Sequence, residues 1–472
     1  MGAAATLAAG IVLTGLLATG LGAYAHFEKQ VTGDRHEFFE ALPLRPFLLF
    51  EQSYRPHIAV KPRLGSDGYP VYPRNGQAIP TLKEKKNIVI FLCDGLRADY
   101  VGPDLTPNMV AFRDRYSVIA PVRHYSTSHF TEQGVFGLLY GLYAYHYMAF
   151  MKAKVSPFPI EMLKRNGYRT EFINGSGFNK YPTDYLAEIF DVTHLPHSDD
   201  EVLATFREVL DKRSKDGQPY LIVVFFYAPH YPFPAKKSFQ RYRPVSKGGK
   251  QGGSIEYRQT LNNRYRNSIL QADDYFRQVF ECIKDDFEGG RTIFLATADH
   301  GTEIYDHGLF GQGKVTFWNE KVMVPFFLAL PGLSLSEGER MPALSSHTDF
   351  WPTVIDYLQP DSLLEPEFYA DGISLLHRSA PNARQRRKIF ITGRYFPYAG
   401  RKNTIVDADR KYWFTIPGVN DDGTLRYDVS RVTDLDDNPV EGFFMAGDAQ
   451  WNEASRDLDR RFWKFLRHTG RN

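Results

Sequence analysis

Four polar side chains of the kinds that bind metal ions follow three long apolar runs of the sequence. The runs cover residues 87–93, 220–226 and 292–297. Asp94 follows the first run, His230 the second, and Asp299 with His300 the third. Carboxylates and imidazoles together suit a divalent cation with mixed oxygen and nitrogen ligands, such as Zn²⁺ or Mn²⁺. Two simpler roles stay open, because a strand-end Asp often serves a turn and an isolated His is often a satisfied core or surface group.

The elements that must position these side chains are those of an α/β fold. Continuous apolar runs are typical of strands buried on both faces of a parallel sheet. Helical patterns lie between them, around 200–213 and from about 255 to 287. This alternation predicts a mostly parallel sheet with helices on both faces. Because the loops after parallel strands converge on one crevice, the sheet would gather the four side chains, which favours a site over separate turns.

Changes in composition and in hydrophobic periodicity divide the chain into four parts. We assign residues 1–25 to a membrane anchor or signal segment, 26–86 to a linker, 87–380 to the domain that carries the site, and 381–472 to a C-terminal subdomain. The linker is rich in Pro, Arg and aromatic residues and shows little periodicity. In the last part, short alternating strands precede a helical stretch over 451–468. This pattern predicts a small antiparallel α+β subdomain.

Composition excludes several classes of protein. The 472 residues contain 43% hydrophobic and 24% charged side chains, values that fit neither a disordered chain nor a polytopic membrane protein. The net charge of +2 gives no argument for nucleic acid as a partner. The two cysteines, Cys93 and Cys282, exclude a disulfide framework and leave a single bridge open.

The N-terminal segment Met1–Ala25 has no charged side chain and is long enough to cross a hydrocarbon layer of ~30 Å. A single anchor helix is our first interpretation, a cleaved signal ending at Ala23-Tyr24-Ala25 the second, and a buried helix the third. Lys29 and Arg35 follow the run, and by the positive-inside rule alone they would keep the rest of the chain in the cytoplasm. That conflicts with the exported location inferred below, unless a larger membrane domain precedes this segment.

The order of the motifs resembles the sulfatase branch of the alkaline phosphatase superfamily over roughly residues 85–375. One such motif is weak evidence, but seven in the right order are specific. The matching motifs are Asp94-Gly95-Leu96-Arg97, Thr106-Pro107-Asn108, Pro229-His230-Tyr231-Pro232-Phe233, Asp299-His300-Gly301, His307-Gly308-Leu309-Phe310-Gly311, Val324-Pro325, and His347-Thr348-Asp349 before Pro352-Thr353.

Departures from the sulfatase pattern resemble one branch of that superfamily. Sulfatases carry a modified Cys or Ser in a Cys/Ser-x-Pro-x-Arg motif, whereas counting back from Tyr140-Gly141 puts Thr131 at the nucleophile and Val135 at the arginine. Gly95 replaces the second Asp of the usual pair, which removes one metal ligand. These changes disfavour ordinary sulfate-ester hydrolysis. They resemble lipoteichoic acid synthases, phosphoethanolamine transferases and related inner-membrane proteins, in which a threonine attacks phosphorus beside a metal.

The resemblance implies one divalent metal ion, Mn²⁺, Zn²⁺, Mg²⁺ or Ca²⁺. The implied ligands are Asp94, Thr131, Asp299 and His300. Thr131 would also form a covalent phospho-enzyme, because coordination activates a hydroxyl that is otherwise a poor nucleophile. It begins a plausible helix, whose N–H groups and dipole favour an anionic phosphoryl group.

Three further side chains are implied to act on the substrate. His230, His307 and Lys314 would hold non-bridging oxygens or protonate the leaving group. Lys314 has the spacing before Val324-Pro325 at which sulfatases carry a substrate lysine, although a solvated loop lysine is the alternative. Gln312 lies near a position where some relatives have a histidine, which weakens the case for catalysis.

Several other residues keep two interpretations. Arg97 would contact an anion or form a structural salt bridge, and His347 with Asp349 would extend the metal set or cap a helix start. Three other hydroxyls compete with Thr131 as the nucleophile, those of Ser126, Thr127 and Ser128. Each can also be an ordinary loop hydroxyl.

The sequence thus predicts a phosphotransferase or phosphodiesterase that acts on a phospholipid or polyol-phosphate head group. It would be anchored to a membrane with its catalytic domain outside the cytoplasm, or else secreted, and would use no nucleic acid. One alternative is a catalytically silent sulfatase-like protein that binds lipid or a protein partner. A second alternative is a sulfuric ester hydrolase with an unusual nucleophile.

Overall fold

The computed structural model describes most of the chain after residue 67. The described residues are 68–73, 79–175, 185, 188–245, 255–311, 315–336, 342–360, 364–376, 387–393, 401–420, 424–441, 448–462, 464 and 466–468. The predicted anchor or signal segment, Gln312 and Lys314 lie outside them. Within the described ranges, no helix combines the length and the apolar character needed to cross a membrane.

A six-stranded sheet in the order β10-β7-β2-β6-β4-β5 forms the centre of the fold. Its strands are β2 Asn87–Cys93, β4 Arg169–Asn174, β5 Val192–His194, β6 Tyr220–Phe226, β7 Thr292–Ala298 and β10 Phe326–Ala329. Neighbouring strands are parallel except β10, which pairs antiparallel with β7. The predicted α/β class with a mostly parallel sheet is therefore confirmed, and the three apolar runs are its three adjacent strands β7, β2 and β6.

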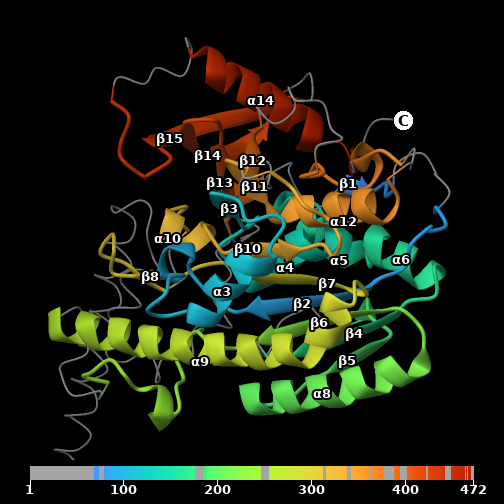
Figure 1. Ribbon diagram of the computed structural model, residues 1–472. Helices are drawn as coiled ribbons and strands as arrows, with labels where there is room; N and C mark the ends of the chain where they lie inside the picture. Colours follow the sequence, from blue (N-terminus) through green and yellow to red (C-terminus); the bar gives the residue numbers. More distant parts are fainter. Residues whose placement is uncertain are drawn as a thin grey trace, which may run out of the picture. The chain divides into compact units, whose positions relative to one another are not determined.

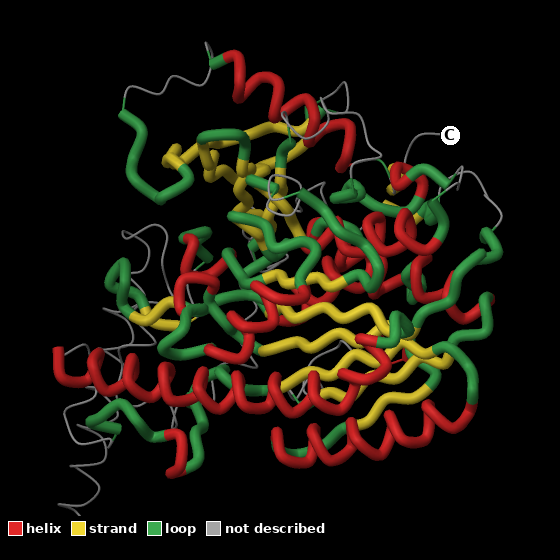
Figure 2. Tube along the Cα trace, viewed as in Figure 1, coloured by secondary structure: helices red, strands yellow, loops and turns green. Residues whose placement is uncertain are grey.

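Helices cover both faces of this sheet, as Figures 1 and 2 show. The helices are α3 Pro107–Tyr116, α4 Thr131–Tyr140, α5 Tyr147–Ala153, α6 Phe158–Arg165, α8 Asp199–Asp216, α9 Ile255–Glu288, α10 Asn319–Val322 and α12 Phe350–Leu358. On β2, Ile88, Ile90 and Leu92 join the core with α4, α5, α6 and α12. The alternate residues of β2, Val89, Phe91 and Cys93, join a second core with α3, α8 and α9. Burial on both faces explains why the strand is apolar throughout.

Short elements complete this part of the chain. The two-stranded pairs are β3 Arg123–Tyr125 with β11 Leu344–Ser346, β8 Glu303–Ile304 with β9 Phe310–Gly311, and β1 Gly68–Pro70 with β16 Leu466–His468. The 3₁₀ turns are Ala98–Tyr100, Ala144–His146, Lys237–Phe239, His347–Asp349 and Pro366–Phe368. Cys93 is buried, Cys282 is exposed and both are free, so the single bridge that the sequence left open does not form.

The C-terminal residues form the predicted antiparallel α+β unit. Its sheet has the order β12-β13-β14-β15, and helix α14 packs its buried Trp451, Leu458 and Phe462 into the same hydrophobic cluster. The elements are β12 Ile389–Thr392, β13 Arg401–Val406, β14 Arg410–Val419, β15 Leu425–Asp434 and α14 Ala449–Phe462.

One boundary in this region was wrong. The helical stretch predicted over 451–468 ends at Phe462, and residues 466–468 form strand β16 instead. That strand pairs with β1, which lies in the predicted linker. Local periodicity cannot reveal a pairing between segments so far apart in the sequence.

Asp273 of α9 fixes the start of α3. Its buried carboxylate accepts hydrogen bonds from the Met109 N–H at 2.9 Å, and from the backbone N–H and the side-chain amide of Asn108 at 3.1 and 2.7 Å. These backbone donors belong to the first turn of α3, where a helix has no partner for them of its own. Asp273 therefore joins two helices that cover the same face of the sheet.

We expect Asp273→Ala to lower the free energy of unfolding by about 2–4 kcal/mol, because it leaves the buried Met109 N–H and the half-buried Asn108 N–H without acceptors. Urea unfolding measures this difference. The control is Asp274→Ala, which removes an ion pair with Arg277 and a hydrogen bond from Gln278, both within one turn of α9, and should cost about 0.5–1 kcal/mol. Equal losses in the two variants would contradict a capping role for Asp273.

Candidate metal centre and active site

The ends of β2 and β7 bring two carboxylates together. The strands are parallel neighbours with Cys93 opposite Ala298, so Asp94 and Asp299 leave the sheet side by side. Backbone hydrogen bonds fix both, with Asp299 N donating to Cys93 O at 3.1 Å and Asp94 N donating to Phe226 O at 3.0 Å. The sheet register therefore determines the separation of the two carboxylates.

Asp94, Asp299 and His300 form a buried group whose ligand atoms all lie within 4.8 Å of one another. His300 Nε2 lies 3.3 Å from Asp299 Oδ2 and 3.7 Å from Asp94 Oδ1. Thr131 Oγ1 lies 3.0 Å from the same nitrogen. The structure thus brings together all four residues that the sequence predicted as metal ligands.

Local hydrogen bonds orient the ligand atoms. Asp299 Oδ1 accepts from Gly95 N at 2.9 Å and from His300 N at 2.7 Å, which leaves Oδ2 facing the centre. His300 Nδ1 lies 2.7 Å from Gly301 O. Because a carbonyl can only accept, Nδ1 carries the proton and Nε2 presents its lone pair on the side of Thr131 Oγ1. This is the arrangement in which an imidazole binds a metal.

The charges at the centre lack compensation among the described residues. Asp94 Oδ1 and Asp299 Oδ2 are buried and have no hydrogen-bond partner there. Burial, and next the charge of Asp299, raise the pKa of Asp94, while burial raises the pKa of Asp299 to about 7. Burial lowers the pKa of His300 to about 4, so its ring is neutral. Two buried carboxylate oxygens and a neutral imidazole nitrogen fit a divalent cation, which would supply the missing positive charge.

Helix α4 carries Thr131 to the centre because small residues let it approach closely. A Cβ atom on Gly134 would lie 2.2 Å from Asp299 O, and one on Gly137 would lie 2.1 Å from Thr127 Oγ1. The helix begins at Thr131, so its first N–H groups face the same region and favour an anion there.

Glu132 is a site residue that the sequence analysis missed. It is half-buried in the first turn of α4. Its charge adds to the burial and the Asp299 charge that raise the pKa of Asp94, and it opposes the burial that lowers the pKa of His300. The available signal was a carboxylate directly after the predicted nucleophile. Its presence adds negative charge beside the centre and strengthens the fit to a cation.

His230 lies close to the centre, after β6. Its Nδ1 is 2.6 Å from Tyr231 O and 2.8 Å from the Tyr227 hydroxyl. Burial, and next the charge of His300, lower the pKa of His230, while the charge of Asp299 acts in the opposite direction. His230 thus interacts electrostatically with two residues of the metal group.

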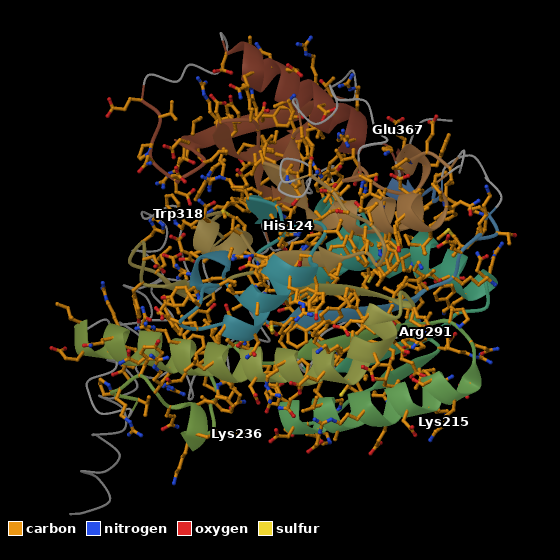
Figure 3. The ribbon with its side chains drawn as sticks, viewed as in Figure 1. His124, Lys215, Lys236, Arg291, Trp318 and Glu367 are labelled. Atoms are coloured by element: carbon orange, nitrogen blue, oxygen red, sulfur yellow. The ribbon has the colours of Figure 1, made fainter. Side chains whose placement is uncertain are left out.

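His307 lies in a different environment. Its ring stacks on Trp318 with centroids 3.9 Å apart, and Nε2 lies 3.3 Å from Glu320 Oε2 (Figure 3 labels Trp318). None of the contacts described for His307 involves Asp94, Asp299 or His300. The structure therefore does not bring His307 into the metal group, and Lys314 lies outside the described residues.

The hydroxyls that compete with Thr131 are committed to other partners. Ser126 Oγ donates to Asp299 O at 2.5 Å, Thr127 Oγ1 donates to Gln133 O at 2.9 Å, and Ser128 Oγ donates to Gln133 Oε1 at 2.8 Å. All three are buried. Their contacts favour the loop-hydroxyl interpretation for each.

His347 lies behind the centre and belongs to a histidine pair. His124 Nε2 is 2.8 Å from His347 Nδ1, and His347 Nε2 is 3.4 Å from Asp299 O (Figure 3 labels His124). Burial lowers the pKa of His347 to about 4. The pair supports the Asp299 backbone, and His347 is not a member of the three-residue metal group.

Asp349 and Arg97 have structural partners. Asp349 and Ser346 form a capping box, with Ser346 N donating to Asp349 Oδ2 at 2.8 Å. The buried Arg97 forms ion pairs with Asp99 and Asp306, each at 2.7 Å. These contacts favour the helix-cap interpretation for Asp349 and the salt-bridge interpretation for Arg97.

Comparison with known proteins gives a family and a fold. The sequence model of the family described as Sulfatase matches residues 86–360. The inner membrane protein YejM of Salmonella typhimurium is 18% identical over 289 residues, which are 61% of this chain and 44% of that protein. The chain spans between 14% and 44% of the length of five curated relatives that it matches.

Two solved structures show the same fold. The putative sulfatase yidJ from Bacteroides fragilis superposes with a TM-score of 0.61 at 14% identity, covering 83% of this chain and 99% of that one. The lipoteichoic acid synthase LtaP from Listeria monocytogenes superposes with a TM-score of 0.56 at 15% identity, covering 80% of this chain and 91% of that one.

The close approach of α4 gives a test of the centre. We expect Gly134→Ala to weaken Mn²⁺ binding by about 10- to 100-fold, because the new Cβ would push Thr131 and the helix away from Asp299. Titration of the purified chain with Mn²⁺, followed by calorimetry, measures the affinity. Gly102→Ala is the control, since its Cβ would meet no atom within 4 Å. Unchanged Mn²⁺ affinity in a folded Gly134→Ala protein would disprove the packing argument.

Proposed function

Because the chain belongs to the sulfatase family of the alkaline phosphatase superfamily, we propose that it is a metal-dependent phosphotransferase or phosphodiesterase with Thr131 as its nucleophile. The family supplies the reaction class, attack on an anionic ester. The observation that carries the proposal is the Thr131 hydroxyl, 3.0 Å from His300 Nε2 at the edge of the Asp94–Asp299–His300 group.

The residue at the nucleophile position favours phosphoryl over sulfuryl transfer. The Cys/Ser-x-Pro-x-Arg signal for the modified sulfatase nucleophile is absent, and buried Val135 stands where that motif has its arginine. An unmodified threonine can form a phosphate ester directly, as a serine does in other covalent mechanisms. The substrate is therefore proposed to be a phosphate ester.

Asp94, Asp299, His300 and the Thr131 hydroxyl would hold the divalent ion. When bound, such an ion supplies a Lewis acid that lowers the pKa of a hydroxyl and neutralises charge on a phosphoryl group. The N-terminus of α4 adds backbone N–H groups for the same phosphoryl oxygens.

The proposed step has two balanced halves. Thr131 Oγ1 forms a bond to phosphorus while the bond from phosphorus to the leaving oxygen breaks, and the proton lost by the hydroxyl is matched by one gained by the leaving oxygen. A water or alcohol then attacks phosphorus, breaks its bond to Oγ1 and restores the Thr131 hydroxyl. In-line displacement of this kind depends chiefly on positioning and charge stabilisation.

His230 is the side chain proposed to exchange a proton with the leaving or entering oxygen. Its Nδ1 lies 2.6 Å from Tyr231 O and must donate there, which leaves Nε2 for the substrate. Burial and the charge of His300 lower its pKa, so the ring is neutral at pH 7 and ready to accept a proton. His307 and Lys314 remain proposed substrate contacts.

The substrate is proposed to be a phospholipid or polyol-phosphate head group, reached from a membrane outside the cytoplasm. The names of two similar proteins, the lipoteichoic acid synthase LtaP and the inner membrane protein YejM, support this substrate class and this location. The uncharged segment Met1–Ala25 supports attachment to a membrane.

We expect Thr131→Ala to reduce Mn²⁺-dependent turnover of an aryl phosphate by about a thousandfold or more, because it removes the atom that attacks phosphorus. The rate is measured as the amount of aryl alcohol released in samples that are quenched at successive times. Mass spectrometry of the wild-type chain after brief exposure to substrate should find a phosphoryl adduct on Thr131.

Ser128→Ala is the matched control. It removes a neighbouring hydroxyl whose partner is Gln133, and it should retain turnover and the adduct. Wild-type rates in Thr131→Ala, or an adduct on a different residue, would refute the proposed nucleophile. Faster release of sulfate than of phosphate from matched aryl esters would replace the proposal with the sulfuric ester hydrolase alternative.

A further inference from the structure

Three polar atoms form a closed triangle in the turn that follows β6. The Tyr227 hydroxyl donates to Tyr231 O at 2.5 Å, and His230 Nδ1 lies 2.6 Å from that oxygen and 2.8 Å from the hydroxyl. We propose that Tyr227 is a positioning residue for His230, which holds the Nδ1 edge of the imidazole inward so that Nε2 faces the reacting ester. This inference rests on the proposed function, in which His230 exchanges a proton with the substrate.

The proton positions in the triangle follow from the Tyr231 carbonyl, which can only accept. The Tyr227 hydroxyl gives its proton to that oxygen, and the proton on His230 Nδ1 points to it as well. The hydroxyl oxygen keeps its lone pairs, one of which faces the Nδ1–H group at 2.8 Å. Both donors therefore have acceptors, and the Nε2 lone pair of the neutral ring lies outside the triangle.

Tyr227 opposes rotation of the imidazole ring. A half-turn of the ring about its bond to Cβ would put Cδ2 in the place of Nδ1 and Cε1 in the place of Nε2. Both hydrogen bonds of Nδ1 would then be lost, and the Tyr227 oxygen would face a carbon atom. The Tyr227 ring also lies beside the imidazole of His230, with centroids 4.8 Å apart. Without the hydroxyl, the Tyr231 carbonyl alone would oppose this rotation.

The ends of β6 and α8 fix the position of Tyr227. The backbone N–H groups of Tyr227 and Ala228 donate to the two carboxylate oxygens of Asp199 at 2.7 and 3.0 Å. Asp199 is buried in the first turn of α8. Tyr227 O accepts from His230 N at 2.8 Å, which closes the turn. Since two elements of the fold hold its backbone, Tyr227 gives the imidazole a rigid reference.

The Tyr227 hydroxyl keeps its proton at neutral pH. Burial, and next the charges of Asp94 and Asp199, raise the pKa of Tyr227 to about 12. A protonated hydroxyl can donate to Tyr231 O and accept from His230 at the same time, whereas a phenolate could only accept. The influence of Asp94 also shows that the hydroxyl lies within electrostatic range of the metal group.

The lone pair of Nε2 is the group that this arrangement presents to the substrate. In the second half of the proposed reaction it takes the proton of the entering water or alcohol, and that proton returns to Thr131 Oγ1 when the bond from Oγ1 to phosphorus breaks. In the first half the proton travels the opposite way, from Oγ1 to the leaving oxygen. Protonation matters most for a strongly basic leaving oxygen, which leaves poorly as an anion. The orientation of His230 should therefore matter more for a phenyl ester than for a nitrophenyl ester.

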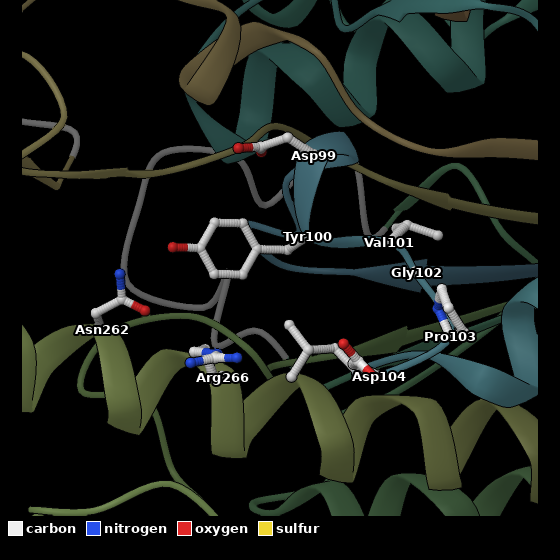
Figure 4. A pocket seen from close by; sticks show the side chains of 9 residues that line it. Asp99, Tyr100, Val101, Gly102, Pro103, Asp104, Asn262 and Arg266 are labelled. Atoms are coloured by element: carbon white, nitrogen blue, oxygen red, sulfur yellow. The ribbon is translucent and has the colours of Figure 1, made fainter.

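A second tyrosine offers a matched control. The Tyr100 hydroxyl is hydrogen-bonded to Asn262, and both residues line a cavity of about 410 Å³ (Figure 4). The Tyr100 ring contacts that of Tyr265, with centroids 5.1 Å apart. None of the contacts described for Tyr100 involves Tyr227 or His230. Tyr100→Phe therefore removes a half-buried hydroxyl and leaves the triangle intact.

We expect Tyr227→Phe to lower kcat/KM with Mn²⁺ about 10- to 100-fold for phenyl phosphate and less than about threefold for 4-nitrophenyl phosphate. The value of kcat/KM reports the half of the reaction that expels the leaving oxygen, so the comparison isolates that step. Mn²⁺ affinity should stay that of the wild type, because no metal ligand changes. Tyr100→Phe should leave both rates unchanged. Equal losses for the two esters in Tyr227→Phe, or equal effects of the two variants, would overturn the positioning role.

Nitrogen-15 NMR of the histidine-labelled full-length chain, in detergent and without Mn²⁺, observes the ring in the absence of turnover. The His230 signals are those that disappear in His230→Gln. We expect the wild type to show a proton on Nδ1 and none on Nε2, and Tyr227→Phe to show shifts averaged between the two tautomers. Identical His230 signals in Tyr227→Phe and the wild type would overturn the proposal. Lack of aryl phosphate turnover by the wild type would refute the proposed function, and the NMR comparison would still decide the role of Tyr227.

Discussion

Two carboxylates and an imidazole buried together at the ends of two parallel strands are the constraint on which this structure depends. Asp94 and Asp299 present oxygens without partners among the described residues, and the lone pair of His300 Nε2 faces them. Such a group is unfavourable by itself, because burial penalises charge and the carboxylates repel each other. A divalent cation would attract both carboxylates and so offset the cost of burying them and their mutual repulsion.

The surrounding fold holds the centre in place through backbone contacts. Strand register separates the two carboxylates, hydrogen bonds from Gly95 and His300 fix one oxygen of Asp299, and Gly134 lets α4 approach the Asp299 carbonyl. The histidine pair behind Asp299 completes the support. Preorganisation of this kind matters most in phosphoryl transfer, where positioning and charge stabilisation do most of the catalytic work.

Helix α9 connects the centre to the surface beside it. Near the centre, the guanidinium carbons of Arg266 and Arg241 lie 3.7 and 5.7 Å from the ring centroid of Tyr242. Tyr265 links the two regions, since its hydroxyl bonds the loop after Asp94. The same helix therefore supports the reaction centre and displays positive charge next to it.

The sequence by itself predicted the α/β class, the three central strands and the strand-end residues Asp94, Asp299 and His300, because buried parallel strands are apolar throughout and deliver the residues after them to one edge. Thr131 was predicted only by the resemblance to the superfamily, since it begins a helix and follows no strand of the sheet. The sequence could not determine that His307 stacks on Trp318, that residues 466–468 pair with β1, or that Glu132 lies beside the centre. Nor could it decide between the two interpretations of Arg97 and Asp349. These depend on contacts between distant segments, which side-chain packing decides and local periodicity does not encode.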